Sequence, residues 1–183
     1  MEKEKIFKKH EGRKDLAGEH AFGDIGQIIL LAIFLTVWIT DSFFIKFSIL
    51  TSDYFSIYIR ISLAMIVLII AIYLAKQGLT IVFAEVREKP IVIQKSVFSI
   101  VRHPIYLGAI LFYPSLLILS FSLSATIVWA AVIIFYFCLC KHEEKLLLET
   151  YGQDYEKYKL ETPMLIPRVI KRNIKCSLKP RKH

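Results

Sequence analysis

Two clusters of polar residues stand at the ends of long apolar runs in this chain. The first is the segment from Arg102 to Gly108 (RHPIYLG), which places a cation, an imidazole and a phenol at the start of one apolar run. The second is the acidic pair Glu143 and Glu144, which follows another apolar run. Because polar groups at such positions are costly unless they bind something, both clusters are candidate functional residues.

The first cluster predicts its own local structure. Proline is favoured in the first turn of a helix, since its missing N–H would be unpaired there and its φ is already helical, so a helix should begin at about Pro104. Arg102 and His103 then lie just outside the membrane, and Tyr106 lies one turn into it. Gly108 leaves room for another helix or a ligand to come close.

The elements that must position these residues are membrane helices. The chain has 183 residues, 55% of them hydrophobic, and a mean hydropathy of +0.51, well above an ordinary soluble domain. We expect an all-α integral membrane protein with about four transmembrane helices and a C-terminal amphipathic helix. The predicted spans are residues 25–40, 57–75, 105–121 and 124–140. They belong to one membrane domain, residues 25–167, between a polar arm (1–24) and a basic tail (168–183).

Several residues near these spans carry expectations of their own. Asp41 should face water after the first span, and Arg60 should extend its charge to the interface, although a buried functional cation is the alternative. The connection 76–103 can lie on the membrane surface. The amphipathic helix should start near Glu143, after the last span, and break at Gly152.

The distribution of positive charge predicts the orientation. All Lys and Arg residues except Lys46 and Arg60 lie in residues 1–24, 76–103 and 141–183. By the positive-inside rule, both termini and the connection 76–103 are cytosolic, so the two polar clusters should meet at the cytosolic face of a multi-pass membrane protein. The basic tail should be attracted to anionic lipid and not to nucleic acid, because no aromatic residues are interleaved with its charges.

These motifs resemble the isoprenylcysteine carboxyl methyltransferase family and its phospholipid methyltransferase relatives. The resemblance is carried by RHPxYxG, a helical hairpin, the acidic pair, Gly152, Tyr155, Tyr158 and the prolines 163 and 167, and covers roughly residues 76–168. It implies a membrane enzyme that binds S-adenosylmethionine at the cytosolic ends of its last helices and takes a lipophilic acceptor from the bilayer. No metal is implied.

The resemblance also implies roles for particular residues. Those implied to bind the cofactor are Ile91, Val92, Ile93, Phe98, His103, Pro104, Ile105, Tyr106, Glu143 and Glu144. His103 and Tyr106 are implied to be catalytic, and His142 is a further candidate proton acceptor. A carboxylate can accept from the ribose or the ammonium of the cofactor, and an aromatic face can accommodate its cation or adenine.

The sequence departs from the family at two places. Ser96-Val97-Phe98 stands where many members have Gly-x-Tyr, so a phenol hydroxyl is lost while a ring remains. Leu139 stands where the prenylcysteine enzymes have an arginine associated with the substrate. An isoprenylcysteine-carboxylate-methyltransferase-like enzyme, acting on an S-prenylcysteine-like or other small lipophilic acceptor, is the leading hypothesis, and N-methylation of phosphatidylethanolamine is the second. A non-catalytic membrane protein that holds lipids through its basic tail is the alternative from another class.

Overall fold

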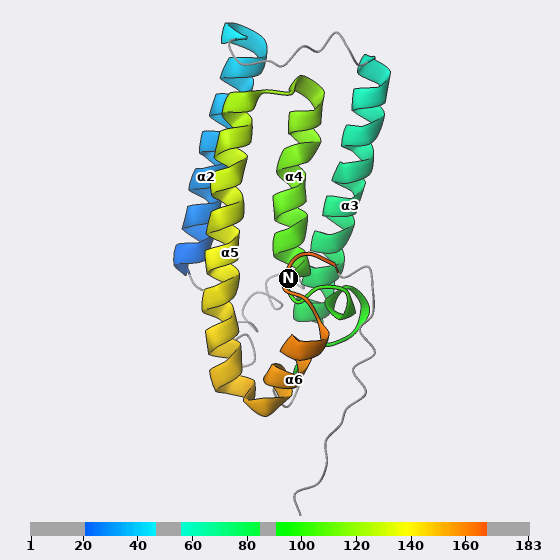
Figure 1. Ribbon diagram of the computed structural model, residues 1–183, viewed down its shortest axis with the longest axis vertical. Coiled ribbons are helices and arrows are strands. Elements are labelled where there is room, and N and C mark those ends of the chain that lie inside the picture. Colours follow the sequence, from blue (N-terminus) through cyan, green and yellow to red (C-terminus); the bar gives the residue numbers. More distant parts are fainter. Residues whose placement is uncertain (1–20, 47–55, 85–90, 168–183) are drawn as a thin grey trace, which may run out of the picture.

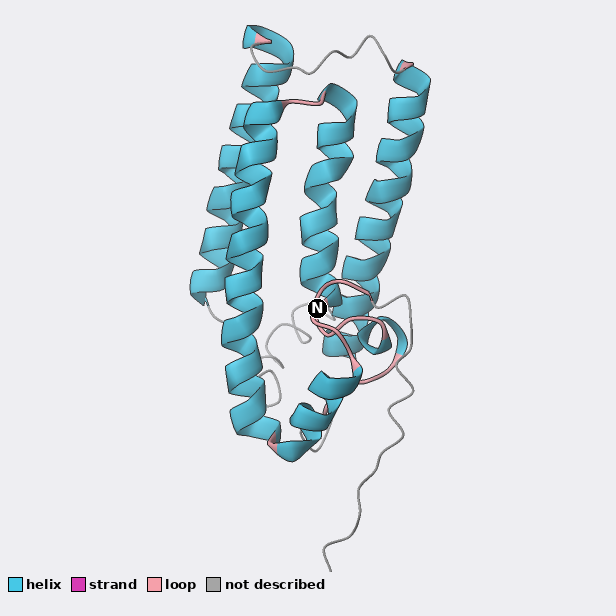
Figure 2. Cartoon of the chain, in the orientation of Figure 1, coloured by secondary structure: helices cyan, strands magenta, loops and turns pink. Residues whose placement is uncertain are grey.

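The computed structural model describes residues 21–46, 56–84 and 91–167 (Figure 1). All of the secondary-structure elements in this part of the chain are helical (Figure 2). They are α2 (Ala21–Ile39), the π-helix η1 (Thr40–Ile45), α3 (Ile57–Ala84), the 3-10 helix η3 (Ser96–Ser99), α4 (Pro104–Ser120), α5 (Leu123–Tyr151) and α6 (Gln153–Glu161). The basic tail and most of the predicted polar arm lie outside the described residues.

Four long helices run side by side, with α2 packed against α5 and α3 packed against α4 (Figure 1). Three helical segments are long and apolar enough to cross a membrane: Ile25–Ile45, Ile57–Phe83 and Leu123–Tyr151. The apolar helix α4 has 17 residues, which corresponds to about 26 Å at 1.5 Å per residue. The expected all-helical fold is confirmed for the described residues, with three segments that could span a membrane, and α4 as a fourth span stays a prediction.

Helix boundaries differ from the predicted ones at three places. Helix α2 begins at Ala21, within the predicted polar arm. Helix α3 continues to Ala84, so the first part of the predicted surface connection is helical. The last predicted span and the start of the predicted amphipathic helix form one helix, α5, whose 29 residues run to Tyr151. The predicted break at Gly152 is confirmed, with φ of 55°, and α6 follows it.

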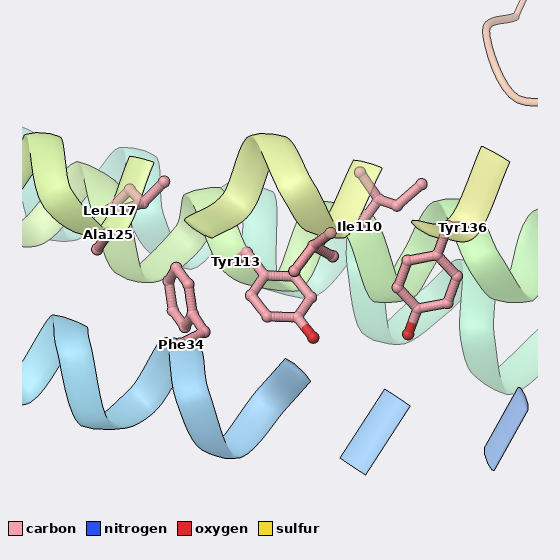
Figure 3. Packing of buried hydrophobic residues seen from close by; sticks show 7 residues of the cluster. Phe34, Ile110, Tyr113, Leu117, Ala125 and Tyr136 are labelled. Carbon is pink, nitrogen blue, oxygen red and sulfur yellow. The ribbon is translucent and has the colours of Figure 1, made fainter. Parts of the chain in front are cut away.

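The main hydrophobic core joins α2, α4 and α5. It contains Phe34, Ile110, Tyr113, Leu117, Ala125, Val132 and Tyr136, several of which are shown in Figure 3. The rings of Phe34 and Tyr113 meet edge to face with centroids 4.7 Å apart, an arrangement that aromatic pairs favour. Many other large apolar side chains on the long helices are exposed, as expected where lipid takes the place of water.

Gly108 lets α4 approach α3 closely, as the sequence predicted. A Cβ atom at this position would lie 2.7 Å from the carbonyl oxygen of Ala71 and 3.0 Å from the backbone nitrogen of Ala75. Small residues at such contacts allow helix backbones to come together in a membrane. This contact lies two residues beyond Tyr106 and fixes the position of the helix that follows the RHP motif.

Residues 120–123 join α4 to α5 at one end of the bundle, called the turn end below. The structure there corrects the expectation for Asp41 and gives Arg60 a hydrogen-bond partner. Asp41 does not face water: it is buried and accepts hydrogen bonds from Ser122 and, at 2.7 Å, from Ser124. Those hydroxyls offset the cost of removing the carboxylate from water. Arg60 is half-buried and donates from Nη1 to the carbonyl oxygen of Leu119 at 2.7 Å, so it satisfies the C-terminal end of α4.

Candidate active site

The RHP motif lies at the other end of the bundle, where α4 begins. Pro104 is the first residue of α4 and His103 is its N-cap, so the predicted helix start is confirmed. The backbone N–H groups of Arg102 and His103 donate to the carbonyl oxygens of Pro163 and Met164, at 2.9 and 3.2 Å. The segment after α6 therefore holds the motif in place from outside the bundle.

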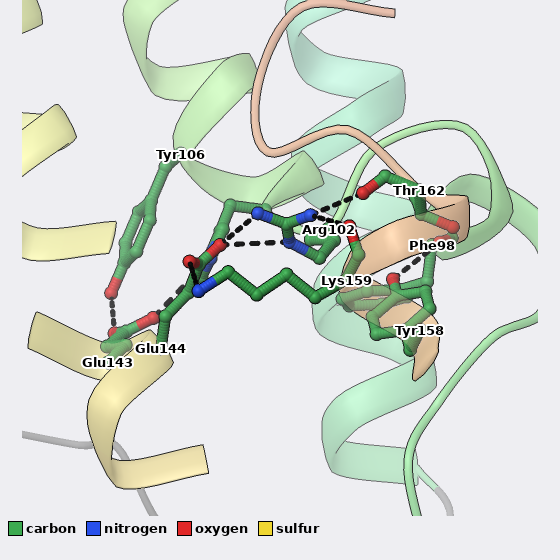
Figure 4. Close-up of polar contacts among 9 residues, drawn as sticks. Phe98, Arg102, Tyr106, Glu143, Glu144, Tyr158, Lys159 and Thr162 are labelled. Carbon is green, nitrogen blue, oxygen red and sulfur yellow. Dashed lines mark hydrogen bonds and ion pairs between the residues drawn. The ribbon is translucent and has the colours of Figure 1, made fainter. Parts of the chain in front are cut away.

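The acidic pair reaches the same place from α5, and its two members face different partners (Figure 4). Consecutive residues on a helix point about 100° apart, since 3.6 residues make one turn. Glu143 accordingly faces Tyr106, while Glu144 faces Arg102 and Lys159. The two polar clusters that the sequence singled out are thus brought together, although 34 residues of helical hairpin separate Gly108 from Glu143.

Tyr106, Glu143 and His103 form one polar cluster in the site. The hydroxyl of Tyr106 donates to Oε1 of Glu143, and Nδ1 of His103 lies 3.4 Å from Oε2 of the same carboxylate. The rings of His103 and Tyr106 stack with centroids 5.8 Å apart. The side chain of Glu143 keeps 16% of its surface exposed, so its oxygens can still accept hydrogen bonds from a bound molecule.

Arg102 is buried and makes four side-chain hydrogen bonds. Nε donates to Oε1 of Glu144 at 2.9 Å, and Nη2 donates to the same oxygen. Nη1 donates to the carbonyl oxygens of Lys159, at 2.9 Å, and Thr162. The ammonium of Lys159 lies 3.3 Å from Oε2 of Glu144. Arg102 thereby joins α5 to the C-terminal end of α6, whose last carbonyls would otherwise be unpaired.

His103 is buried, and its Nε2 atom has no hydrogen-bond partner within the described residues. Nε2 lies 3.7 Å from Oε1 of Glu144. Burial by itself lowers the pKa of a histidine, but the side chains of Cys140, Glu143 and Glu144 raise the pKa of His103 well above its usual value. These neighbours favour the protonated imidazole, in which Nε2 carries a hydrogen that it can donate.

The other residues implied to bind the cofactor lie around this centre in different ways. Phe98 is buried and packs with Leu74, Ile81 and Val97, with Ile93 against the same cluster. Its carbonyl oxygen accepts from Tyr158 at 2.6 Å. Ile91 is exposed, and Val92 is half-buried. Pro104 is buried, and Ile105 lies against Gly78 of α3. Phe98, Ile93 and Ile105 thus have packing roles that would coexist with any contact to a ligand.

Sequence reasoning missed four contributors to the site. They are the Cys140 side chain beside His103, the ring of Tyr136 at 5.5 Å from Tyr106, the ammonium of Lys159 and the carbonyl of Thr162. A signal existed for two of them. Tyr136 and Cys140 stand seven and three residues before Glu143 on a helix, so the period of 3.6 places them near its face. No local pattern reveals that α6 folds back onto Arg102.

Residues 54–154 match the family model described as phospholipid methyltransferase. The chain belongs to this family. No curated protein and no solved structure matches the chain significantly. The part that matches includes the RHP motif and the acidic pair, and it ends near the start of α6.

Membership of the phospholipid methyltransferase family indicates a membrane methyltransferase. The expected resemblance is thereby confirmed at the level of the family. The arrangement of the site is compatible with this chemistry, because a carboxylate, an imidazolium and a phenol at one end of an apolar bundle can bind a polar donor of methyl groups beside a lipophilic acceptor.

Proposed function

We propose that this protein transfers a methyl group from S-adenosylmethionine to a lipophilic acceptor that reaches the site from the bilayer. The observation that carries the proposal is the meeting of Tyr106, His103 and Glu143 at the end of the apolar helices, in a member of a methyltransferase family. S-adenosylmethionine supplies an activated methyl group on a sulfonium and leaves as S-adenosylhomocysteine.

The residues present fit this donor. Glu143 keeps part of its side chain exposed and can accept from ribose hydroxyls or an ammonium group. The buried Nε2 of His103 has no hydrogen-bond partner among the described residues and can donate to a ligand oxygen. The roles of Ile91, Val92, Ile93, Phe98, Pro104, Ile105 and Glu144 towards the donor stay proposals.

Of the two acceptor classes, an amine of the phosphatidylethanolamine type is favoured over a prenylcysteine-like carboxylate. A carboxylate acceptor would need a cation and would compete with the donor for His103, because Arg102 and Lys159 are both paired with Glu144. Leu139 offers none: it packs against the main core, and a Cβ atom at Gly23 of α2 would lie 3.3 Å from its Cδ1. An amine, in contrast, needs an anion to receive its proton, and Glu143 is available.

The reaction would be an in-line displacement. The lone pair of the acceptor nitrogen forms a bond to the methyl carbon as the carbon–sulfur bond breaks and its electrons remain on sulfur. The ammonium acceptor first loses a proton, which we assign to Glu143, directly or through the hydroxyl of Tyr106. His103 is less suited as this base, because its neighbours raise its pKa and so favour the protonated imidazole. Alignment and exclusion of water supply the rest of the rate enhancement.

The site would face the cytosol. This orientation rests on the positive charges of residues 1–24, 76–103 and 141–183. A reporter fused after His183 should be cytosolic, and one inserted between Ser52 and Asp53 should lie on the opposite side. Both reporters on the same side would contradict four spans.

The function is tested with the full-length protein in detergent and in lipid. Calorimetric titration with S-adenosylhomocysteine should show binding, and absence of binding would favour a non-catalytic lipid-binding protein. A lipid extract incubated with labelled S-adenosylmethionine should then yield a methylated lipid. A product stable to base identifies an N-methyl group, whereas a base-labile product identifies an ester and the carboxylate acceptor. His103→Ala should abolish transfer, and Arg60→Ala at the turn end should leave it intact.

A further inference from the structure

Arg102 is placed where an arginine would be expected to bind the anionic part of a ligand, yet its donors are engaged elsewhere. It stands directly before His103 at the start of α4 and is buried. A guanidinium has five N–H donors, and four hydrogen bonds from this one go to Glu144 and to the carbonyls of Lys159 and Thr162. Little capacity remains for a carboxylate or a phosphate from outside.

We propose that Arg102 is a positioning residue, which holds Glu144 and α6 in the arrangement that orients His103 and does not itself bind donor or acceptor. The proposal rests on the proposed methyltransferase function. Three elements meet at this one side chain: the start of α4, the acidic pair on α5 and the C-terminal end of α6 (Figure 4). The backbone hydrogen bonds from residues 102 and 103 to Pro163 and Met164 hold the segment after α6 against the start of α4 as well.

The carboxylate of Glu144 connects Arg102 to His103. Oε1 of Glu144 accepts both bonds from Arg102 and also lies 3.7 Å from Nε2 of His103. Withdrawing the guanidinium would leave this carboxylate free to attract the imidazolium and would also remove a nearby positive charge. Both changes raise the pKa of His103 and draw Nε2 towards Glu144, away from a ligand.

The other groups that bear on His103 come from all the elements around it. They are Cys140 and Glu143 of α5, Tyr106 of α4, and Lys159 of α6 through its pairing with Glu144. Among these groups, Lys159 receives a hydrogen bond from Arg102 at its carbonyl oxygen. A change in His103 that follows substitution of Arg102 is therefore attributable to Glu144, to the Lys159 paired with it and to the lost charge.

The test compares Arg102→Met and Arg102→Lys with wild type, and uses Arg60→Met as the matched control. Arg60 is a second arginine that donates to the carbonyl at the end of a helix, but at the opposite end of the bundle. The measurements are turnover, the pKa of His103 from NMR of histidine-labelled protein in micelles, and binding of S-adenosylhomocysteine and its decarboxylated analogue. The labelled signal is assigned with His103→Gln.

We expect Arg102→Met to lower turnover by about a hundredfold, the scale of a misplacement of about 1 Å. It should raise the pKa of His103 and lower the affinity for S-adenosylhomocysteine and for its decarboxylated analogue by the same factor. Arg102→Lys should restore the pKa of His103 more than it restores turnover, because it keeps the charge but cannot span Glu144 and two carbonyls. Arg60→Met should leave the pKa unchanged.

Two results would overturn the inference. If Arg102→Met lowers activity only in proportion to the unfolded fraction, with the pKa of His103 unchanged, Arg102 is merely structural. If it weakens S-adenosylhomocysteine but not the decarboxylated analogue, Arg102 binds the ligand carboxylate directly. An inactive wild-type protein would instead contradict the proposed function, so the two failures are distinguishable.

Discussion

The hydroxyl of Tyr106 on α4 donates a hydrogen bond to the Glu143 carboxylate on α5. This bond joins the two polar clusters directly, across a hairpin of otherwise apolar helices. It sets the separation of the helix ends at the site, and it holds the carboxylate of Glu143 beside the imidazole of His103.

Glu143→Gln should weaken binding of S-adenosylhomocysteine. Hydrogen bonds to charged groups are worth about 1.5–3 kcal/mol, which corresponds to about tenfold to a hundredfold in the dissociation constant. Calorimetric titration of the purified protein measures this change. Glu149→Gln, an exposed position on the same helix, is the control and should bind normally. Wild-type affinity in Glu143→Gln would remove Glu143 from the binding site.

Tyr106→Phe should lower methyl transfer by about a hundredfold, within the usual contribution of a group that assists proton transfer. The ring and its stacking on His103 remain, so folding should be retained. Initial rates with labelled donor give the effect. Tyr73→Phe, which removes an exposed hydroxyl on α3, should have wild-type rates. Equal rates in both variants would argue against a role for the Tyr106 hydroxyl.

Stability should fall as the pH rises above neutrality. The pKa of His103 in the folded protein is raised above its value of about 6.5 in the unfolded chain. The imidazolium therefore contributes stability that is fully present below about pH 6.5 and is lost as the pH passes through the folded pKa. Thermal unfolding in detergent between pH 6 and 9 measures this loss. His103→Gln should show a smaller slope, and identical slopes would refute the assignment.

Gly108→Ala should destabilise the protein by about 1–3 kcal/mol, the usual cost of overpacking a tight contact. The added methyl group would meet the carbonyl oxygen of Ala71 at 2.7 Å. At an open helix position the same change stabilises by about 0.5–1 kcal/mol. The sign of the change in unfolding free energy therefore shows whether the contact between α3 and α4 is tight. Unfolding in detergent gives the measurement, and an increased stability would mean that α3 and α4 are further apart.

The sequence was sufficient for features with a strong local cause. Pro104 begins α4 because of its fixed φ, Gly108 marks the close contact with α3, and Gly152 ends α5. The meeting of Glu143 with the RHP motif was also predictable, since a hairpin with a short turn must be antiparallel.

Features that depend on tertiary contacts were not predictable. Lys76 and Gln77 look like the end of a membrane helix, yet α3 continues beyond them and Gly78 packs against Ile105. Asp41 would face water if α2 stood alone, but the Ser122 and Ser124 hydroxyls reach it from the turn between α4 and α5. Each case is decided by a neighbour that is distant in the sequence.

The length of α5 has a consequence for the kinetics of the proposed reaction. Its 29 residues extend about 43 Å at 1.5 Å per residue, while a bilayer has a hydrocarbon core of about 30 Å. A helix that enters this core at Leu123 leaves it near Glu143, so the acidic pair would lie at the boundary between the hydrocarbon core and the aqueous phase. The methyl donor then reaches the site by diffusion through water, and the lipophilic acceptor reaches it by diffusion within the plane of the membrane. Turnover would follow the mole fraction of acceptor within the membrane, and diluting the acceptor with inert lipid would slow the reaction even at constant total concentration.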